Sequence, residues 1–275
     1  MGERFIKMHG LGNDFVVLDH LQNPREISAK EAAFWADRRL GVGCDQLVQL
    51  LPGVEGGQAE MRIYNPDGSR AEMCGNAMRC VGLYLKDQHG LGRDGLSVET
   101  MAGMIRTHFG DGGAIAVDMG TPRWSGTEVP HGLDGEMISY PVEIEGENYA
   151  VTAVSMGNPH AVVRVKDAEG FPLEQIGPQI ENHALFPNRI NFEVIQVLGS
   201  RSLRMRVWER GAGITMACGT GACASAVVAM RKNWVERKVE VTLDGGKLEI
   251  EWRGDDRVIM TGPATEVFRG ELSFL

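Results

Sequence analysis

The sequence predicts an α+β fold with two pseudo-symmetric domains, each a mixed or antiparallel sheet or barrel wrapped around a central helix. The first observation is an internal repeat: Met61 begins MRIYNPDGSRAEMCGNAMRC and Met205 begins MRVWERGAGITMACGTGACA, which places Cys74 and Cys218 at one offset of 144 residues. The second is glycine content: 36 of the 275 residues are glycine, against roughly 7% in an average protein. Frequent glycines indicate many tight turns and therefore a strand-rich fold.

The repeat continues along the chain in one order. Gly-Asn precedes an apolar strand at both Asn13 and Asn158, and Gln46 and Asn191 each precede a strand-like run. Self-similarity at a fixed period indicates duplicated structural units. We place the first half at residues 1–119 and the second at 120–262, with the C-terminal segment 263–275 packing with the first. A pseudo-twofold axis between halves would place equivalent residues on opposite sides of one cleft.

Composition limits the function classes. The net charge of −9 argues against nucleic acid or an anionic membrane as the main partner. The chain shows neither the apolar region of a signal peptide nor a run of about 18 apolar residues that could cross a bilayer. Five cysteines, an odd number, do not suggest a disulfide framework. We therefore expect a cytoplasmic protein with reduced thiols.

Elements of the first half follow from local patterns. Residues 4–8 and 15–18 are expected to pair as strands around the turn HGLGN, and the capping-box pattern Ser28-Ala-Lys-Glu31 predicts a helix that ends at Gly41. A helix is expected to begin at Cys74. Further strands are predicted at 47–51, 59–64, 96–100, 104–109 and 114–119, with a turn at 65–68.

The second half repeats this order. The segment from Cys218 to Met230 is apolar on every side and predicts a fully buried helix. We expect a looser, proline-containing segment at 171–187, with His183 in a helix, and a strand at 265–275. The other predicted strands are 138–144, 150–154, 161–165, 191–197, 203–208, 239–243 and 248–252.

Two equivalent thiols at helix starts suggest proton-transfer chemistry. A helix N-terminus favours negative charge, which predicts a lowered thiol pKa at Cys74 and Cys218. The N–H groups that follow could hold a substrate carboxylate and stabilise the species formed when its α-proton leaves. One sulfur could remove the α-proton while the other protonates the opposite side of the carbon, which inverts the centre without a cofactor.

Other interpretations of the cysteines are structural. Both could be small buried hydrophobic residues, the common fate of a free cysteine. A zinc site is disfavoured, because Cys218 and Cys223 would lie about 140° apart around a helix that starts at Cys218. We predict no metal.

The motifs resemble one enzyme family. MCGNAMRC and ERGAGITMACGTGACA closely resemble the two active-site motifs of diaminopimelate epimerase, a pyridoxal-independent enzyme of lysine and peptidoglycan-precursor synthesis. HGLGNDF, VGCDQ, YNPDGS, MGNPH and RINFE resemble other blocks of that family, so the resemblance covers nearly the whole chain. It implies interconversion of L,L- and meso-diaminopimelate, with Cys74 and Cys218 alternating as base and acid.

The resemblance also implies roles for other residues. His160 and Glu209 would adjust the proton affinities of the two thiols. A homodimer is implied as well, although Phe268 stands where some relatives carry a tyrosine at the dimer contact, and Ala77-Met78 departs from the family pattern inside a helix. The implied substrate contacts are Asn13, Gln46, Asn65, Gly75, Asn76, Asn158, Asn191, Glu209, Arg210, Gly219 and Thr220.

These assignments make chemical sense for a substrate with two amino-acid ends, since Arg210 suits a distal carboxylate. Alternatives are ordinary turn residues for Asn13 and Asn158, a surface ion-pairing dipeptide for Glu209-Arg210, and an exposed residue before a strand for Gln46. At the level of the whole protein, the alternatives are a two-cysteine racemase acting on proline or hydroxyproline, a binding protein without catalysis, and a thiol redox protein.

Overall fold

The computed structural model describes residues 2–92, 95–110 and 113–272 and divides the chain into two compact units. One unit contains Met1–Asp118 and Gly262–Leu275, and the other contains Met119–Thr261. Sheet strands dominate the described residues, with helices α1 to α4 between them. The α+β class predicted from the sequence is confirmed. Residues 273–275 of the predicted last strand lie outside the described residues.

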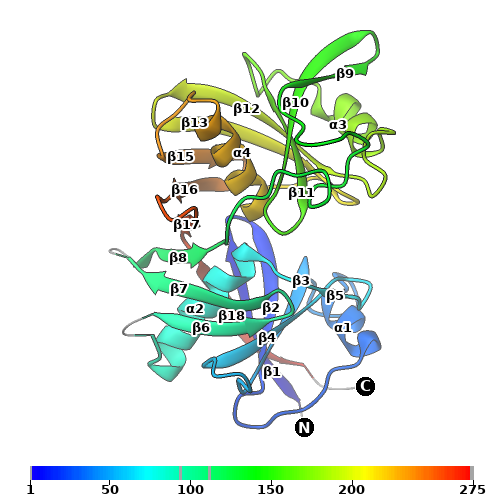
Figure 1. The fold of residues 1–275 in the computed structure, drawn as a ribbon. Helices are drawn as coiled ribbons and strands as arrows, with labels where there is room; N and C mark the ends of the chain where they lie inside the picture. The colour runs from blue at the N-terminus through cyan, green and yellow to red at the C-terminus, as the bar shows by residue number, and fades with distance from the viewer. Residues whose placement is uncertain (1, 93–94, 111–112, 273–275) are drawn as a thin grey trace. The chain divides into compact units, whose positions relative to one another are not determined.

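The first unit is built on one mixed sheet (Figure 1). Its strands, in order of pairing, are β18 (Thr265–Leu272), β1 (Glu3–Gly10), β2 (Asn13–Asp19), β3 (Gln46–Leu51), β4 (Ala59–Tyr64), β6 (Leu96–Thr100), β7 (Gly103–Phe109) and β8 (Ile115–Asp118), with the short β5 (Arg70–Ala71) also beside β4. The β2–β3 and β4–β6 pairs are parallel and the rest are antiparallel. The parallel β2–β3 register sets Phe15 opposite Gln46 and so brings Asn13 near the start of β3.

Helix α2 (Gly75–His89) is the central helix of this unit. It contacts β1, β2, β7 and β8. Its first eight residues, Gly75 to Gly82, are all buried. The helix ends at His89, and its C-cap residue Gly90 has a left-handed φ of 63°, which glycine adopts readily. The sheet therefore encloses the N-terminal half of α2, and Cys74 lies at the start of that enclosed part.

The second unit repeats this pattern of pairing. Its sheet contains β9 (Tyr140–Ile144), β10 (Glu147–Ser155), β11 (Pro159–Arg164), β12 (Asn191–Gly199), β13 (Ser202–Glu209), β15 (Lys238–Leu243), β16 (Gly246–Trp252) and β17 (Val258–Gly262), with β14 (Gly213–Ile214) beside β13. Two pairs of its strands are parallel. The β11–β12 pair corresponds to β2–β3 of the first unit, and the β13–β15 pair corresponds to β4–β6. The sequence repeat is therefore a repeat of topology.

Helix α4 (Gly219–Arg231) is the central helix of the second unit. It contacts β10, β11, β12, β13, β15 and β16, and it lies against β13, β15 and β16 in Figure 1. Every residue from Gly221 to Met230 is buried. A helix that is apolar and small-sided all round fits inside a curved sheet, as its sequence predicts.

The first strand of each repeat, β1 or β10, pairs with one additional strand, and this additional strand comes from a different part of the chain in each unit. In the second unit β9 pairs with β10 and precedes it in the chain. In the first unit β18, from the C-terminus, takes the matching place beside β1. The last segment of the chain therefore completes the sheet of the first unit.

Two helices differ from the sequence prediction. Helix α1 (Ala29–Ala36) has the predicted capping box but ends at Ala36 rather than at Gly41, because Asp37 is extended and its carboxylate accepts the N–H groups of Arg39 and Leu40. Helix α3 (Leu173–Glu181) forms in the segment expected to be loose, even though it contains Pro178. The free energy gained by burying the apolar side of α3 exceeds the cost of placing Pro178 in the helix. His183 lies beyond its end, so the helical placement of His183 was wrong.

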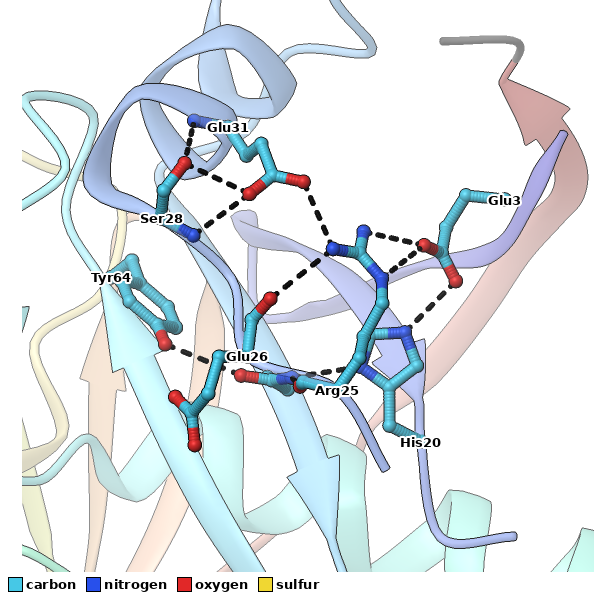
Figure 2. A network of polar contacts seen from close by, with 8 residues as sticks. Glu3, His20, Arg25, Glu26, Ser28, Glu31 and Tyr64 are labelled. Atoms are coloured by element: carbon cyan, nitrogen blue, oxygen red, sulfur yellow. Dashed lines mark hydrogen bonds and ion pairs between the residues drawn. The ribbon is translucent and has the colours of Figure 1, made fainter. Parts of the chain in front are cut away.

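A polar network lies inside the first unit (Figure 2). His20 Nε2 lies 2.9 Å from Glu3 Oε1, and Arg25 donates to the other oxygen of Glu3 at 2.6 Å. On its other side His20 Nδ1 meets Gln49 Nε2 at 2.7 Å, and Tyr64 Oη donates to Gln49 Oε1 at 3.2 Å. Gln49 is fully buried. This network contains none of the predicted site residues.

Candidate active site

Each repeated cysteine is the N-cap residue of the central helix of its unit. Cys74 caps α2 with φ −142° and ψ 114°, and Cys218 caps α4 with φ −117° and ψ 111°. The first N–H groups of a helix have no intrahelical acceptor and bind anions well. In this chain those groups belong to Gly75 and Asn76 in α2 and to Gly219 and Thr220 in α4. Each unit can therefore present a thiol beside an anion-binding helix start.

The first unit brings Asn13 to Cys74. Cys74 is half-buried, and its Sγ lies 3.8 Å from Asn13 Oδ1, which also accepts from Asn76 Nδ2 at 3.1 Å. Asn13 Nδ2 donates to Asp45 Oδ2 at 2.9 Å. Arg38 holds the second oxygen of Asp45 at 2.7 Å. Asp45 therefore fixes the amide of Asn13 so that its carbonyl oxygen is the end beside the thiol.

Gln46 and Asn65 form a second pair of amides in the first unit. Gln46 Nε2 donates to Asn65 Oδ1 at 3.0 Å, and Asn65 Nδ2 donates to Ser69 Oγ at 3.0 Å. Both amides are half-buried. Gln46 begins β3, directly beside the strand that begins at Asn13. The predicted amide ligands of this half are thus placed on neighbouring strand ends.

Cys218 is more deeply buried than Cys74, with 5% of its surface exposed. Gly221 N–H donates to its Sγ at 3.4 Å, and Thr220 Oγ1 lies 3.5 Å away. A Cβ added at Gly221 would lie 2.8 Å from Glu193 Oε1 and 3.2 Å from the sulfur. Glycine is therefore needed at 221 because a carboxylate and a thiol both crowd that position.

Burial raises the pKa of the Cys218 thiol well above its ordinary value, and the carboxylates of Glu209 and Glu193 raise it further. The hydrogen bonds from Thr220 and Gly221 act in the opposite direction and are outweighed. The lowered pKa predicted from the helix N-terminus is wrong for Cys218. Desolvation and two acidic neighbours exceed the effect of the helix dipole.

His160 joins a predicted substrate residue to a buried carboxylate. His160 Nδ1 lies 2.6 Å from Glu193 Oε1, and His160 Nε2 lies 2.9 Å from Asn158 Oδ1. The side chains of His160 and Glu193 are both completely buried. Burial raises the pKa of Glu193, while the His160 partner lowers it by less. The three residues form one continuous chain of hydrogen bonds that ends at Asn158.

Asn191 organises the loop that carries Arg210. Its Nδ2 donates to the Pro159 carbonyl at 2.9 Å, and its Oδ1 accepts the Arg210 N–H at 2.9 Å. The guanidinium of Arg210 is exposed and donates to the Asn188 carbonyl at 3.1 Å. Glu209 accepts a hydrogen bond from Thr215. Asn191 is buried, so it is placed to position the neighbouring backbone.

The structure thus divides the predicted residues into two sets. The first unit contains Asn13, Gln46, Asn65, Cys74, Gly75 and Asn76, and the second contains Asn158, His160, Asn191, Glu209, Arg210, Cys218, Gly219 and Thr220. Asp45, Glu193 and Gly221 were not predicted as site residues from the sequence. A signal existed for Glu193, since it is the charged residue inside the apolar run FEVI, and an acid that is buried needs a partner. Among the described residues no group of three His, Cys, Asp or Glu could hold a metal ion.

Comparison with known proteins identifies close relatives. A sequence profile of the family described as diaminopimelate epimerase matches residues 5–125 and 152–267. The diaminopimelate epimerase of Magnetococcus marinus is 70% identical over 272 residues, which cover 99% of this chain and 98% of the relative. Diaminopimelate epimerase 1 of Nostoc sp. is 48% identical over 99% of this chain and all of the relative.

Solved structures with the same fold are much more distant in sequence. A phenazine biosynthesis protein of the PhzF family from Bacillus anthracis superposes with a TM-score of 0.71 at 15% identity, and the match covers all of both chains. A hydroxyproline epimerase from Agrobacterium vitis gives a TM-score of 0.70 at 14% identity, with 98% of this chain and 91% of that chain covered. No helix in the described part of this chain is long and apolar enough to cross a membrane.

Proposed function

This chain belongs to the diaminopimelate epimerase family, and we propose that it interconverts L,L-diaminopimelate and meso-diaminopimelate. The observation that carries the proposal is the duplicated thiol. Both repeated cysteines cap the buried central helix of their unit with nearly the same backbone conformation. A single buried cysteine would need no catalytic explanation, but two in equivalent positions suit a reaction that requires a proton on either side of one carbon.

In the proposed mechanism both thiols act on the same α-carbon. The thiolate of one cysteine takes the α-proton, and the S–H of the other gives its proton to the opposite side of the carbon. The carbon is inverted, the negative charge has moved from one sulfur to the other, and no electron is lost or gained. The reverse direction exchanges the roles of Cys74 and Cys218. Neither step requires a cofactor.

The helix starts would stabilise the intermediate. Loss of the α-proton places charge on the substrate carboxylate, and preorganised N–H donors are most effective where such charge develops. The proposed donors are the backbone N–H groups of Gly75, Asn76, Gly219 and Thr220. Donors of this kind are worth about 2.7–4 kcal/mol each when they are removed from other enzymes that use them.

The acidic surroundings of Cys218 suit it to the role of resting acid. Burial and the carboxylates of Glu209 and Glu193 keep this thiol protonated. Glu209 would therefore act on the chemistry through charge, and His160 would act through Glu193, which it contacts at 2.6 Å. We therefore assign Glu209 and His160 to control of the proton affinity of the Cys218 thiol.

The amides and Arg210 would bind the substrate. A distal carboxylate needs a cation, and the exposed guanidinium of Arg210 is suited to bidentate binding. An ammonium needs oxygen acceptors, and Asp45 turns the carbonyl oxygen of Asn13 toward Cys74 and Asn76, whose hydrogen bonds to it the ammonium would replace. Gln46, Asn65, Asn158 and Asn191 complete the proposed set. A substrate with two amino-acid heads would use several neutral amides together with one cationic side chain.

The proposal includes a homodimer in the cytoplasm. Val267 and Phe268 of β18 expose 53% and 48% of their surfaces, and such an apolar strand surface suits contact with a second copy. A cytoplasmic site follows from the mechanism, because it needs both thiols reduced. Sedimentation of the protein and of Phe268→Glu tests the dimer: the wild type should sediment as a dimer and the variant as a monomer.

Chiral chromatography tests the substrate. The protein should convert pure L,L-diaminopimelate to the meso form and the meso form back, toward one equilibrium mixture. Proline and trans-4-hydroxyproline, offered separately as single stereoisomers, should remain unchanged. Faster inversion of either imino acid than of diaminopimelate would reject the proposed substrate.

A further inference from the structure

The two equivalent asparagines are held by opposite ends of their amides. In the first unit Asp45 accepts from Asn13 Nδ2 at 2.9 Å, so the carbonyl oxygen of Asn13 faces Cys74 and Asn76, from which it accepts. In the second unit His160 Nε2 lies 2.9 Å from Asn158 Oδ1, so the NH₂ group is the available end. The repeat therefore directs the amide oxygen of Asn13 toward its helix start, whereas it binds the amide oxygen of Asn158 to His160.

The donor character of Asn158 depends on a hydrogen at His160 Nε2. An amide oxygen only accepts, so the 2.9 Å contact requires that Nε2 donate. A neutral imidazole carries one hydrogen, and which nitrogen holds it is set by the partner of the other nitrogen. That partner is Glu193 Oε1, 2.6 Å from Nδ1. Glu193 thus decides which end of Asn158 is presented.

When Glu193 and His160 share one proton, His160 Nε2 carries a hydrogen whichever of the two residues holds that proton. If it lies on Nδ1, the imidazole is cationic and Nε2 also carries hydrogen. If it lies on the carboxyl group, Glu193 donates to Nδ1 and the neutral imidazole carries its hydrogen on Nε2. Burial raises the pKa of Glu193, which favours keeping this proton in the pair over leaving a bare carboxylate beside neutral histidine.

The first half shows that the fold itself does not need this pair. Phe15 is the equivalent of His160, because it follows Asn13 by two residues, as His160 follows Asn158. Val48 is the equivalent of Glu193, because it pairs with Val17 in the parallel register in which Glu193 pairs with Val162. Both Phe15 and Val48 are fully buried and apolar. A buried acid and histidine in the second half therefore have a role other than filling the core.

We propose that Glu193 is a positioning residue, which acts through His160 to hold the NH₂ group of Asn158 toward a carboxylate oxygen of the substrate. This inference rests on the proposed function for the identity of the substrate, but the hydrogen-bond chain exists without it. A carboxylate needs donors, and an asparagine free to turn would present its oxygen in part of the molecules. Glu193 and His160 remove that choice.

Substitution at Glu193 separates positioning from packing. Glu193→Gln keeps the pattern, because the new NH₂ group can donate to His160 Nδ1 while Nε2 still donates to Asn158. Glu193→Leu fills the space and removes the partner of Nδ1. We expect kcat/KM for L,L-diaminopimelate to fall less than about tenfold in the glutamine variant and about 100-fold in the leucine variant, the size of loss that a misplaced binding group can cause.

A double-mutant cycle with Asn158→Ala identifies the route. Glu193→Gln and Glu193→Leu both remove the carboxylate that raises the pKa of Cys218, so the difference in kcat/KM between these two variants isolates positioning. If Glu193 positions Asn158, that difference should disappear once Asn158 is alanine. A merely structural role would leave the difference unchanged. An unchanged difference, or a Glu193→Leu enzyme as active as the wild type, would overturn the inference.

The matched control is Gln49→Leu, which removes a fully buried side chain of the same length from the network of Figure 2. Gln49 holds His20 and Tyr64, not a site residue, so this variant should lose stability and keep kcat/KM. Tyr64→Phe removes one bond of the same network and serves if Gln49→Leu does not fold.

Nitrogen-15 NMR of the histidines tests the inference without activity. The His160 Nε2 resonance should be that of a protonated nitrogen in the wild type and in Glu193→Gln, and should move toward a mixture of tautomers in Glu193→Leu. An unprotonated Nε2 in the wild type would overturn the inference even if the epimerase assay succeeds. Failure of the wild type to invert diaminopimelate would instead reject the proposed function and leave this NMR test to decide the inference.

Discussion

Gly221→Ala should destabilise the protein, although the same change in most helices stabilises it. Alanine is favoured over glycine in a helix interior by about 0.5–1 kcal/mol. At position 221 the added Cβ would lie 2.8 Å from Glu193 Oε1 and 3.2 Å from Cys218 Sγ. Glu193 is fully buried and cannot move into solvent.

The magnitude follows from these opposing effects. Inserting a methyl group into a well-packed core costs about 1–3 kcal/mol. Subtracting the helix preference leaves a net loss of about 1 kcal/mol, and a loss of that size lowers Tm by about 2–4 °C in a chain of this length. Because relief of the clash must displace the carboxylate or the sulfur, we also expect kcat to fall about 10–100-fold.

Differential scanning calorimetry and the epimerase assay measure the two effects. The control is Gly82→Ala in α2, where the nearest atoms to the added Cβ would be Ile115 Cγ2 at 3.3 Å, Thr107 Oγ1 at 3.7 Å and Phe109 Cε1 at 3.9 Å, none of them a carboxylate or thiol atom. It should change Tm little and leave kcat unchanged. If Gly221→Ala raised Tm and kept full activity, the crowding of Glu193 and Cys218 at this position would be refuted.

Three further predictions concern the thiols, acid stability and one buried hydroxyl. Cys74→Ala and Cys218→Ala should each abolish inversion while circular dichroism shows an intact fold. Cys80→Ala, in the helix that Cys74 caps, should remain active. Normal turnover by either of the first two variants would discard the two-thiol mechanism. Burial alone would raise the pKa of Asp14, but hydrogen bonds from Arg38 and Lys7 outweigh it and lower the pKa from 3.8 to about 2, so its stabilisation is complete above pH 3.8 and is lost as the pH falls toward 2. Asp14→Asn should therefore cost about 1–2 kcal/mol in urea unfolding at neutral pH and much less at pH 2, where half of the carboxyl groups are protonated in the folded protein. An equal cost at both pH values would contradict this assignment. Ser225→Ala in α4 should raise the free energy of unfolding by about 1 kcal/mol, because the Ser225 hydroxyl is buried without a hydrogen-bond partner among the described residues. A loss of stability in thermal unfolding would show that this hydroxyl has a hydrogen-bond partner.

The repeat and the helix starts could be predicted because they depend on local patterns. Cys-Gly followed by small apolar residues defines both the start and the burial of α2 and α4, and the structure begins these helices at Gly75 and Gly219. Helix α3 was missed because Pro178 normally interrupts a helix. Burial of Leu173, Ile176 and Ile180 by the second unit stabilises this helix, and a local rule does not include that tertiary packing.

The residues that hold the site were harder to predict than the residues that form it. Asp45 and Glu193 touch no reacting atom in our account, and their importance depends on which end of Asn13 and Asn158 they fix. The pKa of Cys218 was mispredicted for a related reason. The helix start is visible in the sequence, but the carboxylates that surround the sulfur come from other strands.

Turnover of L,L-diaminopimelate in D₂O, followed by chiral separation and mass spectrometry, tests the two-thiol mechanism most directly. We predict that the first meso product carries one deuterium at the inverted α-carbon while the remaining L,L substrate carries none, because one group removes the proton and a different, solvent-exchanged thiol delivers its replacement. Meso product without deuterium, or early deuterium in the unreacted L,L substrate, would contradict that mechanism.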